Sequence, residues 1–258
     1  MVTFLTDSEL RSAAPSIYAE NPSERVSDRY SFLPTTRVLD ILKEEGWEPW
    51  KASQVRSRST GMSNTAKHLI RLRHEDLELD SEDTDGGLFP EIIVVNAHNG
   101  LAAYQLRAGV FRLVCSNGMV VAEREFAPIR IRHQAFEDSD VYEASRVFCE
   151  NVTHLNSTLG SWRETDLDRP TQQVFAAKAA RIRFTNPGSD IVDNVLTPRR
   201  SADTGSDLWS VFNRCQENLL QGGYLNTETR RRVRPIKSIQ KDLFINSRLW
   251  ELANTFAN

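Results

Sequence analysis

The hydrophobic pattern changes its period once, near residue 138, and this change constrains the fold more than any other feature of the chain. Before it, several segments alternate in the manner of β-strands, as in 66–76, where Ile70 and Leu72 fall on one face. After it, apolar residues recur at helical spacing, first over 144–159. A run of strands followed by a run of helices predicts an α+β protein with an antiparallel sheet.

The boundaries of this arrangement follow from local signals. Pro34 begins a predicted short helix that ends at Gly46 and precedes the sheet. We expect one compact unit, because 258 residues suffice for one large domain with a packed core. Its expected parts are an N-terminal arm, a sheet region and a helical region packed on the sheet, at 1–30, 31–138 and 139–258.

The motifs of common catalytic sites are absent from the sequence. It has no P-loop, no nucleophile elbow and no zinc-binding or deaminase signature. None of the six lysines follows an acidic residue at the spacing typical of restriction-type nucleases. We therefore assign no catalytic residue, no metal and no cofactor, and we expect that the protein is not an enzyme. A metal-dependent enzyme acting on nucleic acid stays open as an alternative.

Single reactive residues give weak alternatives to this expectation. Cys115 stands at a predicted strand end and is a conceivable nucleophile, but a lone cysteine more often packs as a small apolar residue. His68, His74 and His133 fall on apolar faces of predicted strands, where we favour structural roles. A metal site formed by histidines from different strands stays open.

The cysteine content and the hydrophobic pattern indicate the cellular compartment of the protein. The three cysteines are odd in number and widely spaced, which argues against a disulfide framework and is typical of a reducing cytoplasm. No apolar run approaches the roughly 18 residues that a membrane span needs. The first residues lack the basic and apolar parts of a secretory signal. We therefore expect a cytoplasmic protein with no membrane partner.

Charge is segregated along the chain, although the net charge is only -3. The segment 51–74 carries six basic residues and no acidic one, and 75–91 carries eight acidic residues and no basic one. A second basic segment, 227–241, has six basic residues against Glu228. A net charge near zero can therefore conceal strong local fields.

The alternating segments place arginines on the face of each strand opposite its apolar residues. If those faces point outward together, they form a basic plane suited to a phosphate backbone, because guanidinium groups grip phosphate in a bidentate manner. Two alternatives stay open: an acidic protein partner, and neutralisation of the arginines by 75–91. The predicted nucleic-acid-binding residues are Arg56, Arg58, Arg71, Arg73, Arg130, Arg132, Arg230, Arg231, Arg232 and Arg234.

Four phrases of the sequence are distinctive: the turn Asn99-Gly100, the segments 111–119 (FRLVCSNGM) and 208–223 (LWSVFNRCQENLLQGG), and the ending 246–250 (NSRLW). Together they resemble a family found in phages and plasmids, the domain-of-unknown-function family 932. The resemblance runs over roughly residues 30 to 258. It implies a mobile-element protein in the cytoplasm of a bacterial host cell.

The order of elements is also similar to that of single-strand annealing recombinases. Those proteins open with a helix that ends near Gly-Trp, here Gly46-Trp47, continue into a sheet and pack a long helix across it. This likeness covers about residues 34 to 160 and implies a homo-oligomeric ring that holds single-stranded DNA. Our leading hypothesis is a DNA-binding protein that recognises single strands and promotes annealing or protects entering DNA. The alternative is an inhibitor of a host defence system that binds a host protein.

Overall fold

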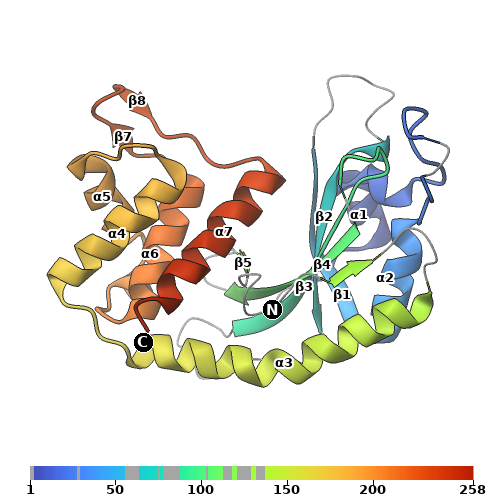
Figure 1. Cartoon of the computed structure of the whole chain (residues 1–258), viewed down its shortest axis with the longest axis horizontal. Coiled ribbons are helices and arrows are strands. Elements are labelled where there is room, and N and C mark those ends of the chain that lie inside the picture. The colour runs from blue at the N-terminus through green and yellow to red at the C-terminus, as the bar shows by residue number, and fades with distance from the viewer. Residues whose placement is uncertain are drawn as a thin grey trace. The chain divides into compact units, whose positions relative to one another are not determined.

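A computed structural model gives the fold (Figure 1). The chain divides into two compact units, and the boundary between them falls inside one long helix. The first unit comprises the described residues of Met1–Ser81, Leu88–Phe111 and Phe126–Val152, and the second comprises the remainder. The structure describes residues 3–27, 30–55, 64–74, 76–77, 88–102, 104–112, 118–120, 129–131 and 137–257.

Antiparallel strands and short helices form the first unit. The strands β1 to β4 neighbour one another in chain order, and β6 pairs with β4. This confirms the predicted α+β order of a short helix, an antiparallel sheet and a helical half, although α1 and the 3-10 helix, which precede that short helix, were not predicted. The elements are α1 (Asp7–Ala13), a 3-10 helix (Pro15–Tyr18), α2 (Thr35–Glu44), β1 (Trp47–Gln54), β2 (His68–His74), β3 (Leu88–Asn96), β4 (Tyr104–Arg112) and β6 (Ile129–Ile131).

The strand β2 lies between β1 and β3 and is antiparallel to both. Every residue from His68 to Arg73 is buried, so both faces of this strand are covered. The core beside it includes Trp47 of β1, whose Nε1 donates to Ser145 Oγ at 2.9 Å. Ser145 belongs to the long helix α3 (Asp138–Glu164), so the first part of that helix packs on the sheet.

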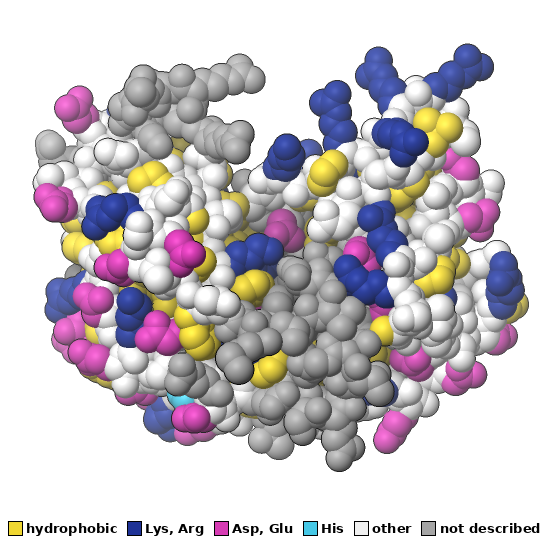
Figure 2. Space-filling model, turned by 180° about the vertical axis from the view of Figure 1, so that it is seen from behind, with side chains coloured by type: hydrophobic (Ala, Val, Ile, Leu, Met, Phe, Trp, Pro, Cys, Tyr) yellow, Lys and Arg dark blue, Asp and Glu magenta, His cyan; other side chains and the backbone are white. Residues whose placement is uncertain are grey.

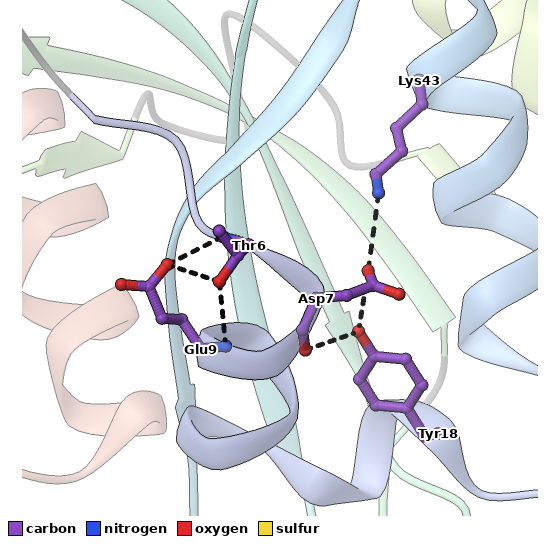
Figure 3. A network of polar contacts seen from close by, with 5 residues as sticks. All are labelled: Thr6, Asp7, Glu9, Tyr18 and Lys43. Carbon is purple, nitrogen blue, oxygen red and sulfur yellow. Dashed lines mark hydrogen bonds and ion pairs between the residues drawn. The ribbon is translucent and has the colours of Figure 1, made fainter.

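The N-terminal segment, which we expected to form an arm over 1–30, is folded into the first unit. Thr6 and Glu9 form a reciprocal capping box at the start of α1, with the Glu9 carboxylate 2.8 Å from Thr6 N. The Tyr18 hydroxyl donates to Asp7 Oδ1 at 3.2 Å, and Lys43 of α2 lies 3.8 Å from the same oxygen (Figure 3). Burial is the main cause that raises the pKa of Tyr18 to about 12.

Helices dominate the second unit (Figure 1). Its core contains three aromatic rings: the centroid of Trp162 lies 5.0 Å from that of Phe212 and 4.6 Å from that of Trp250. The elements are β5 (Gly118–Val120), α4 (Arg169–Arg183), α5 (Ser189–Leu196), a 3-10 helix (Ser201–Asp203), α6 (Leu208–Gln221), β7 (Leu225–Asn226), β8 (Arg231–Arg232) and α7 (Ile239–Asn254).

Two segments settle points that the sequence alone leaves open. The pair Ala108-Gly109 is typical of a break between two strands, but the chain forms one strand from Tyr104 to Arg112. The segment 190–205 is typical of a loop or a short element, and the short helix α5 forms there because Ile191 and Val195, one turn apart, are both buried. In the part of the chain described above, no helix is both long and apolar enough to cross a membrane.

Candidate nucleic-acid interface

The two arginines of β2 lie in the interior of the first unit and not on an outward-facing plane. Arg71 is 3% exposed, and its Nη1 lies 2.6 Å from Oε2 of Glu91, a fully buried residue of β3. The pairing of the strands explains this contact, because Arg71 is in register with Ile93 and Glu91 lies two residues away on the same face. Arg71 therefore neutralises an internal carboxylate.

Arg73 occupies the same interior cluster. It is 6% exposed, its guanidinium carbon lies 3.5 Å from the centroid of the Phe89 ring, and it is in register with Glu91. Burial raises the pKa of Glu91, and the charges of Arg71 and Arg73 oppose that rise. A buried guanidinium next to a carboxylate cannot meet a phosphate backbone without unfolding the strand. The expectation that these two arginines face outward was therefore wrong.

The other predicted sheet arginines are placed only in part. Arg56, Arg58 and Arg132 lie outside the described residues. The backbone of Arg130 is described: it lies in β6, in register with Gln105 of β4. The predicted convergence of guanidinium groups on one face of the sheet thus has no support from the residues whose side chains are described.

The second basic segment begins in the hairpin of β7 and β8, which projects from the helical unit, and ends on α7. The strands β7 and β8 are antiparallel, with Leu225 opposite Arg232 and Asn226 opposite Arg231. In the turn between them the Asn226 side chain accepts a hydrogen bond from Thr229 N at 2.8 Å. Arg230 has a φ of 53°, a left-handed conformation that is uncommon for a residue with a side chain. Asparagine capping and this conformation together reverse the chain.

The base of the hairpin is fixed to the end of α6. Gly222 has a φ of 59°, and a Cβ atom at this position would lie 2.5 Å from the carbonyl oxygen of Val233. Only glycine permits this approach, which brings Gly223 N to 2.8 Å from the same oxygen. Arg183 of α4 also donates to the carbonyl oxygen of Arg234. The hairpin is therefore held at its base while its charged side chains stay in solvent.

We call the six basic residues of this segment the basic hairpin. All six are exposed, and none forms an ion pair with another described residue. Seen from behind, Lys and Arg side chains project together from the part of the second unit that carries β7 and β8 (Figures 1 and 2). The basic hairpin consists of Arg230, Arg231 and Arg232 in the turn and β8, Arg234 and Lys237 in the chain that follows, and Lys241 at the start of α7.

Sequence reasoning named four of these residues but not the hairpin itself. Each strand has two residues, which is too short for a period-2 pattern to be visible. In the sequence, the pair Gly222-Gly223 follows a helical apolar period and indicates only the end of a helix. The same pair also brings the chain before β7 into contact with the chain after β8. This contact is made with Val233, ten positions after Gly223, so the local sequence does not reveal it.

A polar network is buried in the first unit and has the character of core structure. His68 Nδ1 lies 2.8 Å from Ser16 Oγ, and His68 Nε2 lies 3.0 Å from Thr35 Oγ1. His98 Nε2 lies 3.1 Å from the same hydroxyl. Burial, with His98 as the second cause, lowers the pKa of His68 to about 3, so the ring is neutral near pH 7. Complete burial separates this network from any dissolved substrate.

The other residues considered for catalysis are dispersed. His74 is half-buried and His154 is exposed, while His133 and Cys115 lie outside the described residues. Burial raises the pKa of Cys215 to about 12, which leaves a protonated, weakly nucleophilic thiol. Within the described ranges, no group of three or more His, Cys, Asp or Glu residues could hold a metal ion.

The fold and the exposed charge define an α+β protein whose helical unit carries an exposed basic hairpin. The chain belongs to the family described as domain of unknown function DUF932, whose model matches residues 22–250. The match begins earlier than the resemblance inferred from the sequence, since it includes part of the folded N-terminal segment. Two relatives in Escherichia coli K12 support this membership.

The UPF0380 protein YafZ is 34% identical over 253 residues, which cover 96% of this chain and 90% of YafZ. The UPF0380 protein YfjQ is 34% identical over 255 residues, which cover 97% of this chain and 91% of YfjQ. These alignments span both units of the structure. The comparison with solved structures gave no match.

Proposed function

We propose that this protein binds nucleic acid through the phosphates, with the basic hairpin as its contact surface. The observation that carries the proposal is the exposure of six basic side chains that form no ion pair with the described residues. The segment 227–241 opposes them with the single carboxylate of Glu228. Such a surface releases counterions from a phosphate backbone when it binds, which gives favourable free energy at low salt.

The composition of the hairpin favours phosphate over an acidic protein as the ligand. Four of its six basic residues are arginines, whose planar guanidinium groups bind phosphate oxygens in pairs. The hairpin also projects, so that a flexible strand can pass along it without entering a cleft. The resemblance to phage- and plasmid-borne proteins supports a role with the DNA of a mobile element, in annealing or in protection.

The proposal is tested by fluorescence anisotropy with a labelled oligonucleotide over a series of salt concentrations. For single strands, each phosphate contact contributes about -0.7 to the slope of log K against log salt. Four to six contacts predict a slope of about -3 to -4. The double variant Arg231→Gln, Arg234→Gln should make the slope less steep by about 1.4.

A control variant in the same unit distinguishes the loss of phosphate contacts at the hairpin from the loss of net charge. Arg169 and Arg181 are exposed on α4, and the double variant Arg169→Gln, Arg181→Gln removes the same charge. Its slope should equal that of the unmodified protein. Equal slopes for the two double variants, or no binding at low salt, would overturn the proposal. Light scattering with and without the oligonucleotide tests the predicted oligomer separately.

A further inference from the structure

An aromatic ring is exposed directly after the basic hairpin, on α7. Phe244 is 52% exposed, although large aromatic side chains are usually buried. It follows Lys241 by three residues and precedes Arg248 by four, so the three side chains form one stripe on the helix surface. Six residues of helix place Phe244 about 9 Å along the axis from the cap residue Ser238.

Basic groups flank this ring on both sides. Lys241 is exposed, and the guanidinium carbon of Arg248 lies 5.7 Å from the centroid of the Phe244 ring. Glu251 partly neutralises Arg248 at 2.8 Å, while Lys241 is the last residue of the basic hairpin and joins its charge to α7. A ring between cations, beside a surface suited to phosphates, has the composition of a base-stacking platform.

The first unit provides a contrast with this arrangement. Tyr142 of α3 is also an exposed aromatic residue, at 36%. Its hydroxyl donates to Glu44 Oε2 at 2.5 Å, so a carboxylate lies directly beside it. A phosphate chain would be repelled there. Of these two exposed rings, only Phe244 combines an open π-surface with positive neighbours.

We infer that Phe244 is a stacking site for unpaired bases and that the ligand is therefore single-stranded nucleic acid. The inference rests on the proposed function, because the hairpin supplies the phosphate contacts that bring the strand to α7. In a duplex the faces of the bases are occupied by their neighbours, so the ring has nothing to stack on. Single strands offer every base as a partner, which makes the contact tolerant of sequence.

The test compares three labelled ligands of equal length: oligothymidine, its duplex with oligoadenosine, and an oligomer whose sugars carry no bases. Phe244→Ala should weaken binding of oligothymidine at least about 5-fold, the lower limit for loss of one stacked base. Its affinities for the duplex and the abasic oligomer should not change. Phe244→Trp should restore the affinity for oligothymidine, because tryptophan has a larger π-surface.

Two controls keep the outcomes distinct. Tyr142→Ala removes an exposed ring from the acidic surroundings and should change no affinity. Circular dichroism should show native helix content for Phe244→Ala, since the side chain is half-exposed. If Phe244→Ala binds oligothymidine normally while Arg231→Gln, Arg234→Gln binds weakly, the stacking site is overturned and the proposed function stands. If the unmodified protein binds none of the three ligands at low salt, the proposed function itself fails.

Discussion

Replacement of Arg71 by methionine should destabilise the protein without changing how it binds nucleic acid. Methionine preserves most of the apolar stem but leaves the Glu91 carboxylate, which is 0% exposed, without the guanidinium at 2.6 Å. Removing one partner of a buried ion pair typically costs about 3–5 kcal/mol. Because Arg73 stays close to Glu91, we expect a loss near the lower limit, about 3 kcal/mol.

Urea unfolding followed by circular dichroism measures this loss. If the free energy of unfolding decreases by about 2 kcal/mol per molar urea, the midpoint of unfolding should move to a urea concentration about 1.5 M lower. The double variant Arg71→Met, Glu91→Gln should recover part of the stability, because a neutral amide replaces the unpaired carboxylate and leaves a polar group beside Arg73. Arg146→Met is the surface control: Arg146 pairs with Glu143 and Glu150 in solvent, and we expect no measurable change.

The binding experiment completes this test. The salt slope of Arg71→Met should equal that of the unmodified protein, measured under conditions where the variant is folded. A variant that keeps its full stability but has a less steep salt slope would refute the reasoning, because Arg71 would then contact phosphate and not Glu91.

Two further predictions concern stability. Because the unfolded chain protonates His68 near pH 6.5 and the folded protein only near pH 3, stability should fall as pH falls through this range, by about 1 kcal/mol between pH 7 and 5.5. In urea unfolding, His68→Gln should make the free energy of unfolding less dependent on pH, whereas the control His154→Gln should not. If His68→Gln leaves the pH dependence unchanged, His68 is not the group responsible. Gly222→Ala should cost about 1–3 kcal/mol, because alanine is strained at this φ and meets the Val233 carbonyl. Gly160→Ala on α3 is its control, since a Cβ added at Gly160 has no neighbouring atom within 4 Å apart from the backbone of its own helix. A Gly222→Ala protein with unchanged stability would contradict the geometry.

The long amphipathic elements were predictable from the sequence because their apolar period is repeated over several turns. The α3 pattern over 144–159 lies inside the observed Asp138–Glu164. The helix α1 was missed although its capping box, from Thr6 to Glu9, is visible in the sequence. Its apolar face is short, with Leu10 as the buried residue, so periodicity gave no signal.

The position of the β2 arginines was not predictable from period alone. Alternation correctly separates Arg71 from Ile70 and Leu72 but does not say whether the second face is solvated. The decisive residue is Glu91, a carboxylate in the middle of the apolar strand β3, which requires a buried partner. Recognition of that partner requires the register between β2 and β3. Charge in a solvated hairpin needs no such partner, so the basic segment 227–241 could be predicted from composition.

The central claim is that nucleic acid lies on the basic hairpin and not on the sheet. Arginine footprinting with phenylglyoxal and mass spectrometry, with and without oligothymidine, tests it most directly. Bound DNA should protect Arg230, Arg231 and Arg234 from modification, while Arg169 and Arg181 react equally in both samples. Unchanged reactivity at the hairpin in a sample where the DNA is bound would contradict the account.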